Sequence, residues 1–215
     1  MTMRTFERLP QHWQRVFTLE WEAVCAGSKA IAAVIADREG NILSEGRNLT
    51  GERRIPNPAA AHAETEAVRN LDVSRYPDKH SYILYAGLEP CVMCMGTLVM
   101  GGIRHIEIAA HDRFGGAMHL MQHSAFIRCK QIEVRWTEPF LGDMQRAFQT
   151  IREQLYNHDE EKKQRMLTDF SACNKAGVEA ACILTGHGFF TRKKPADYTA
   201  NDIYTAILQI MNRKE

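Results

Sequence analysis

The chain has 215 residues and a mass of 24.5 kDa, which is long enough for one well-filled domain with residues to spare. Hydrophobic residues make up 45% and charged residues 25%, a composition that excludes a mostly disordered chain. The formal net charge of +1 excludes the global basic field of a dedicated nucleic-acid binder, although a local basic patch stays open.

Membrane and secretion signals are absent from the sequence. No apolar run reaches the roughly 18 residues of a membrane span, and residues 1–13 lack the apolar core of a signal peptide. We therefore expect a cytoplasmic protein that does not associate with membranes. In that compartment close cysteine pairs indicate metal or redox chemistry, whereas cysteines without a paired spacing are expected to be buried small apolar residues. Those without a partner are Cys25, Cys129, Cys173 and Cys182.

Hydrophobic spacing predicts an alternating α/β domain. Apolar residues recur every three or four positions over 11–26, which predicts a helix that ends at Gly27. The apolar run over 30–36 predicts a buried strand, and 42–45 its hairpin partner. The further predictions are a long loop over 47–59, helices over 61–71, 92–100 and 140–155, and strands over 82–86, 103–109 and 132–136.

The predicted α/β domain ends near Asn157, which divides the chain into a catalytic domain over 1–157 and a C-terminal extension over 158–215 whose role cannot be read. Residues 158–165 form a charge run that fits an exposed helix or a linker. An apolar run follows at 178–184, and a helical stripe over 203–211 stands behind a possible Thr199/Asp202 capping pair.

Two short motifs carry the candidate chemistry. Cys91 and Cys94 are three residues apart after Pro90, so they fall on one side of the first turn of a predicted helix. The amide groups and dipole of a helix N-terminus favour thiolate over thiol, and thiolate is the form that binds metal. Upstream, His62 and Glu64 stand two positions apart, about 200° around a regular helix. Both side chains can enter one pocket only where the chain is just turning into a helix.

One histidine and two cysteines supply three zinc ligands and leave the fourth position open, which is the mark of a catalytic site. Zinc lowers the pKa of its water toward about 7, and a nearby carboxylate must then move the protons. A lone Cys-x-x-Cys could instead be a redox pair or half of a structural zinc knuckle. The upstream His62 and Glu64 favour the catalytic interpretation.

The pattern His-x-Glu…Pro-Cys-x-x-Cys is the known signature of zinc deaminases. Over about residues 10–157 the chain resembles the cytidine/deoxycytidylate deaminase superfamily. The segments Ala61–Glu64 and Leu88–Gly96, with Asn48 ahead of them, are most similar to the branch of bacterial tRNA adenosine deaminases and guanine deaminases. The resemblance implies a three-layer α-β-α sandwich around a mixed five-stranded sheet, and a homodimer.

The resemblance also implies residue roles. His62, Cys91 and Cys94 would hold one Zn²⁺ per chain, and Glu64 would move protons between water, substrate and departing ammonia. Three further residues would contact the substrate: Asn48, the N–H of Ala63, and Asp112. Asn48 could equally be a turn residue that stabilises its loop.

Three functions compete. The favoured one is hydrolytic deamination of a free nucleobase, nucleoside or related heterocycle. The second is conversion of adenosine to inosine in a tRNA anticodon loop, and the third is a deaminase-fold subunit that only binds, which the presence of Glu64 disfavours. The near-neutral charge counts against tRNA, as does segment 112–118, where tRNA-editing relatives carry a lysine followed by Gly-Ala and Gly-Ser. The opening strand also has Ala32 where relatives commonly have glycine.

Overall fold

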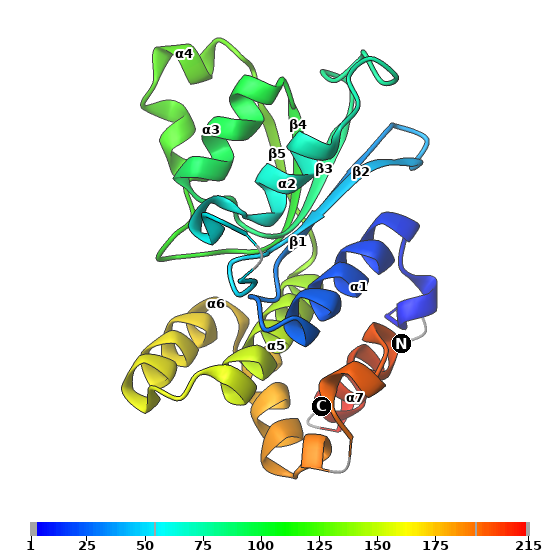
Figure 1. Cartoon of the computed structure of the whole chain (residues 1–215), viewed down its shortest axis with the longest axis vertical. Coiled ribbons are helices and arrows are strands. Elements are labelled where there is room, and N and C mark those ends of the chain that lie inside the picture. Colours follow the sequence, from blue (N-terminus) through cyan, green and yellow to red (C-terminus); the bar gives the residue numbers. More distant parts are fainter. Residues whose placement is uncertain (1–3, 54, 192, 214–215) are drawn as a thin grey trace.

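A computed structural model describes residues 4–53, 55–191 and 193–213 (Figure 1). Its main elements are, in chain order, α1 (Gln11–Cys25), β1 (Ala32–Ala36), β2 (Ile42–Arg47), α2 (Ala63–Asn70), β3 (Ile83–Leu88), α3 (Val92–Gly101), β4 (His105–Ala110), α4 (Ala125–Arg128), β5 (Glu133–Trp136), α5 (Pro139–Tyr156), α6 (Glu160–Gly186) and α7 (Ala200–Asn212). The helices and strands predicted up to residue 155 are confirmed, with their ends shifted by a few residues.

The five strands form one mixed sheet in the order β2-β1-β3-β4-β5. β1 pairs antiparallel with β2 and β3, whereas β3, β4 and β5 run parallel. The start of β1 and the ends of β2, β3 and β4 therefore meet at one end of the sheet, with Ala32 opposite Arg47 and Leu88 opposite Ala110. We call this the carboxyl end of the sheet.

Helices cover both faces of the sheet, so the predicted three-layer sandwich is confirmed (Figure 1). All five β1 side chains are buried because they alternate between two cores. Ala33 and Ile35 pack with α2 and α3, whereas Val34 packs with α1 and α5. α2 and α3 begin at the carboxyl end of the sheet, because each follows the loop that leaves that end.

The C-terminal segment packs on the outer side of α1 and α5 (Figure 1). α6 lies along α5, and buried residues of α6 and α7 join the core that α1 and α5 share. The predicted cap of α7 is confirmed, since Thr199 Oγ1 accepts from the Asp202 N–H at 3.1 Å. The division of the chain at residue 157 stays a prediction.

The charge run over 158–165 contains the exposed start of α6, a helix of 27 residues with non-helical backbone only at Asn174, so the exposed-helix interpretation of this run is confirmed. The expectation of burial is wrong for Cys129 and Cys173, which are exposed: Cys129 follows the short helix α4, and Cys173 lies on the solvent side of α6. Cys25 and Cys182 are half-buried. No helix in the described part of the chain is both long and apolar enough to cross a membrane.

Candidate active site

The candidate site lies at the carboxyl end of the sheet, where α2 and α3 begin. His62 is the N-cap residue of α2 and Cys91 the N-cap residue of α3, both with extended backbone. Cys94 follows in the first turn of α3 and is buried. The loops that leave the sheet therefore deliver an imidazole and two thiols from two neighbouring helix N-termini.

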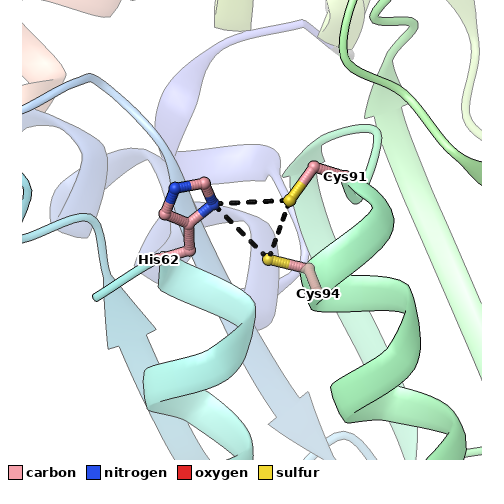
Figure 2. Close-up of side chains that lie close together, drawn as sticks. All are labelled: His62, Cys91 and Cys94. Atoms are coloured by element: carbon pink, nitrogen blue, oxygen red, sulfur yellow. Dashed lines mark hydrogen bonds between the residues drawn. The ribbon is translucent and has the colours of Figure 1, made fainter. Parts of the chain in front are cut away.

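The three donor atoms form a nearly equilateral triangle (Figure 2). His62 Nδ1 lies 3.5 Å from Cys91 Sγ and 3.6 Å from Cys94 Sγ, and the two sulfur atoms are 3.6 Å apart. Tetrahedral zinc with ordinary bond lengths requires about 3.8 Å between two sulfurs and about 3.6 Å between sulfur and nitrogen. The residues present therefore fit a zinc ion. Among the described residues this is the one group of three histidine, cysteine or acidic side chains close enough to share a metal.

Glu64 places a carboxylate beside the triangle. Its side chain is buried, and Cys94 Sγ donates to Glu64 Oε2 at 3.2 Å. His62 and Glu64 reach the same space because His62 has extended backbone while Glu64 already lies in the helix. The spacing of His62 and Glu64 allows both side chains to enter one pocket only where the chain turns into a helix, and the structure places them at such a position.

The electrostatics of the site follow from its burial and its close hydrogen bonds. The close hydrogen bond between Cys91 and Cys94, aided by His62, lowers the pKa of Cys91. That bond and burial raise the pKa of Cys94, so the metal-free site favours one thiolate. Burial raises the pKa of Glu64 above its ordinary value, which makes this carboxyl a ready proton carrier. A divalent cation among the donors favours deprotonation of the second thiol as well.

Asn48 lies one residue beyond β2, at the same end of the sheet. Its N–H donates to Ile31 O at 2.9 Å, and the next residue, Leu49, donates to Ala61 O at 3.0 Å. The Asn48 side chain is buried, and its Oδ1 accepts from Thr50 N at 3.1 Å and Thr50 Oγ1 at 2.6 Å. Asn48 Nδ2 has no hydrogen-bond partner in the described structure. Asn48 thus stabilises its turn, as the second interpretation expected, and still retains an unused donor; contact with substrate stays a prediction.

Ala63 and Asp112 border the same end of the sheet. Ala63 is the buried first residue of α2, so its N–H is one of the amides that find no carbonyl within a helix. Asp112 follows β4, and its Oδ1 accepts from the N–H groups of Phe114 and Gly115 at 3.2 and 3.1 Å. Their roles toward substrate stay predictions.

Sequence reasoning missed two features of this region. Phe114, at the tip of the turn after Asp112, is 95% exposed. Its only signal was an apolar residue inside a glycine-containing turn. The second is Arg146 of α5, whose guanidinium lies 3.8 Å from the Asp112 carboxylate. Arg146 gave no local signal because its role depends on how α5 packs.

Comparisons with known proteins agree with this site. The sequence model of the family described as "Cytidine and deoxycytidylate deaminase zinc-binding region" matches residues 7–110. A tRNA-specific adenosine deaminase of Bacillus subtilis is 31% identical over 130 residues, which cover 57% of this chain and 76% of that protein. The chain therefore belongs to the cytidine and deoxycytidylate deaminase family, and the predicted family is confirmed.

Relatives with different substrate names match to a similar degree. A tRNA-specific adenosine deaminase of Haemophilus influenzae is 35% identical over 99 residues, covering 45% of this chain and 55% of that protein. The guanine deaminase of Bacillus subtilis is 34% identical over 98 residues, covering 45% and 61%. The match thus spans between half and two thirds of these two relatives. A structure of guanine deaminase from Nitrosomonas europaea superimposes with a TM-score of 0.53 at 22% identity, covering 66% of this chain and 82% of that one, which shows a shared fold.

Proposed function

We propose that this chain is a zinc-dependent hydrolase that removes an exocyclic amino group from a free nucleobase, nucleoside or related heterocycle and releases ammonia. The observation that carries the proposal is the buried Glu64 carboxylate, 3.2 Å from a thiol that belongs to a triangle of donors with zinc spacing. A structural zinc site has four protein ligands and needs no buried carboxylate beside them.

The metal would be held by His62 Nδ1, Cys91 Sγ and Cys94 Sγ, one ion per chain. When bound, zinc supplies Lewis-acid activation of water at neutral pH. The three ligands lie at the N-termini of α2 and α3. The free amide groups there stabilise negative charge and so favour the thiolate form of both cysteines.

Glu64 would act as the general acid and base. In hydrolytic deamination water adds to the ring carbon that carries the amino group, and the carbon–nitrogen bond then breaks to leave a carbonyl and ammonia. Glu64 accepts a proton from the attacking water, passes it to a ring nitrogen, and returns the second water proton to the departing amine. Burial helps, because it lets the carboxyl hold a proton between successive transfers.

Substrate positioning would use the donors that the fold leaves unpaired. Asn48 Nδ2 is buried without a partner in the part of the chain that the structure describes, and a ring nitrogen or carbonyl of a heterocycle would satisfy it. The Ala63 N–H would face the ring from the start of α2. Asp112, at the end of β4, would border the pocket.

Adenosine in a tRNA anticodon loop is the second candidate substrate. It is favoured by relatives of about one-third identity that are named tRNA-specific adenosine deaminases. Against it stand the net charge of +1 and the departures in segment 112–118. The buried Glu64 carboxylate beside the donor triangle argues against a subunit that only binds.

A homodimer is part of the proposal. Val92 and Met100 on α3 are 65% and 74% exposed, and a side chain added at Gly96 between them would meet open space. These residues form an apolar strip on α3 that no described element covers. Such strips on soluble proteins commonly mark subunit interfaces. A cytoplasmic location also stays a prediction.

The test is an ammonia-release screen of zinc-loaded protein against nucleobases, nucleosides, pterins and a tRNA anticodon stem-loop. We expect turnover of a small heterocycle that disappears when a chelator removes the metal and returns when zinc is restored. Turnover of the stem-loop alone would establish the second candidate. Release from no substrate, by protein shown to hold one zinc per chain, would contradict the proposal.

A further inference from the structure

A buried arginine lies behind the candidate site. Arg146 of α5 is only 2% exposed, and burial of a guanidinium is costly unless it is paired. Its Nη2 donates to His111 O at 2.6 Å, and its Nη1 donates to Gln149 Oε1 at 2.9 Å. The Asp112 carboxylate lies 3.8 Å away. Two of these three partners belong to the segment that follows β4, so Arg146 fixes the start of that segment.

The segment 111–118 is tied on its other side to the metal-ligand loop. Glu89 accepts from Asp112 N at 3.1 Å and from Met118 N at 3.2 Å through its two carboxylate oxygens. Ala117 N donates to Pro90 O at 3.0 Å, and Gly116 forms a bridge with Cys91. We call 111–118 the anchor turn. Because it pairs with Cys91 itself, its position sets the backbone of a metal ligand.

The C-terminal helix α6 covers the arginine from behind. The guanidinium carbon of Arg146 stands 4.3 Å from the ring centroid of Phe170, a cation–π distance. Phe170 is 6% exposed and packs with Leu167 and Val178 in a small cluster on α6. Phe170, Arg146 and the anchor turn therefore form a continuous chain of contacts from α6 to Cys91.

We propose that Arg146 and Phe170 are positioning residues for the active site, through which α6 holds the anchor turn against the metal-ligand loop. The proposal assigns a role to the segment after residue 157 and rests on the proposed deaminase function for its catalytic consequence. An ordinary packing role would not require a charge here, since apolar residues of similar volume commonly stabilise a core at least as well as buried ionic groups do. The charge is retained because its donors reach the backbone carbonyl of His111 and the Asp112 carboxylate.

The chain contains a closely matched control for Phe170. Phe140 on α5 is also 6% exposed, and the Arg4 guanidinium stands 4.6 Å from its ring centroid. Phe140 packs against Tyr204 of α7, and within the described residues its ring makes no aromatic or cation–π contact with the anchor turn. Phe170→Leu and Phe140→Leu thus each remove a buried aromatic face beneath an arginine, but only the first touches the proposed chain of contacts. Phe170→Tyr keeps the ring and serves as the rescue variant.

Amide hydrogen exchange of the zinc-loaded protein, read by mass spectrometry on a peptide over 111–118, tests the proposal without any substrate. The amides of residues 112 and 114–118 are hydrogen-bonded in the structure, so they exchange slowly when the turn is held. We expect exchange about tenfold faster in Phe170→Leu and in Arg146→Met, and wild-type rates in Phe140→Leu and Phe170→Tyr. Equal exchange in Phe170→Leu and Phe140→Leu would overturn the proposal.

The catalytic arm compares the same variants on the substrate that the screen identifies. We expect kcat/KM to fall about tenfold in Phe170→Leu, with zinc content unchanged, and to stay within about twofold of wild type in Phe140→Leu. If the wild-type protein turned over no substrate, the proposed deaminase function would be refuted. The hydrogen-exchange comparison would still test whether Phe170 and Arg146 hold the anchor turn in place. Faster exchange with unchanged kcat/KM would overturn the catalytic role of the positioning residues.

Discussion

At the scale of single residues, the most unusual side chain outside the site is Glu20 of α1. It is fully buried, and it lies over β3 so closely that a Cβ added at Gly87 would collide with its carboxyl group. Within the described residues neither Glu20 oxygen accepts a hydrogen bond. Burial raises the pKa of Glu20 well above its ordinary value, and Gln145 and Arg146 offset this only in part. We infer that Glu20 is neutral in the folded protein.

Glu20→Gln should change how stability depends on pH. Above the ordinary carboxyl pKa of about 4.3 the unfolded chain releases the Glu20 proton while the fold retains it, so the free energy of unfolding falls as pH rises toward the raised pKa. Glutamine does not titrate, so Glu20→Gln should gain stability relative to wild type between about pH 5 and about pH 8. Urea denaturation across that range measures this. Glu22→Gln, on the exposed side of α1, is the control, and parallel curves for Glu20→Gln and wild type would refute the inference.

The residues discussed above differ in how far the sequence alone predicts their positions. Local spacing pairs His62 with Glu64 and Cys91 with Cys94, and the family signature that these residues match predicts that the two pairs meet. Glu20 also had a signal, because it stands three positions after Phe17 and four before Val24 on the buried face of α1. Phe170 and Arg146 had none, since a cation–π contact between two helices depends on packing that spacing does not define.

At the scale of elements, the sequence predicts where a helix is capped but not how helices pack against one another. The Thr199/Asp202 pair predicts the start of α7, because each side chain satisfies an amide that the first helical turn leaves free. The charge run that opens α6 indicates only an exposed surface. Its apolar residues, such as Leu167 and Phe170, lie outside that run, and they acquire a buried face only through α5. The full length of α6 therefore could not be predicted.

Thr199→Ala should destabilise the protein by about 1 kcal/mol, because it removes the acceptor for the Asp202 N–H at the start of α7. Thr205→Ala on the exposed side of the same helix is the control, since its hydroxyl bonds only a neighbouring side chain, Asn201, at 3.1 Å. Denaturant midpoints measure both changes. Similar midpoints for the two variants would show that the capping box does not contribute as the geometry indicates.

At the scale of the whole molecule, the order of the strands in the sheet does not follow from predicting the individual helices and strands. The same elements could pair in several orders, and the five-stranded order was expected from family resemblance rather than from hydrophobic pattern. This order matters for the site, because it brings the ends of β2, β3 and β4 together. Asn48, Cys91 and Asp112 thereby reach one end of the sheet from distant parts of the sequence.

The proposed homodimer gives a prediction at this scale. Met100→Glu would place a charge in the apolar strip on α3, and burial of an unpaired charge in an interface is strongly unfavourable. We expect the wild type to sediment as a dimer at micromolar concentration and Met100→Glu as a monomer. Tyr156→Glu, which changes a residue that is 37% exposed at the end of α5, on the opposite face of the sheet from α3, should remain dimeric. A monomeric wild type would contradict the proposed assembly.

The central claim is that Glu64 moves the protons of hydrolytic deamination beside a zinc ion. The most direct measurement is the maximal rate of ammonia release by Glu64→Gln, with Glu66→Gln as control, because Glu66 lies on the same helix but pairs with Arg69 at 2.8 Å. Glutamine keeps the size of glutamate and cannot accept and return a proton. We predict normal zinc content in both variants, a rate loss of about 10²–10⁴-fold in Glu64→Gln, and a near wild-type rate in Glu66→Gln. Ammonia release by zinc-loaded Glu64→Gln within about tenfold of wild type would contradict the account.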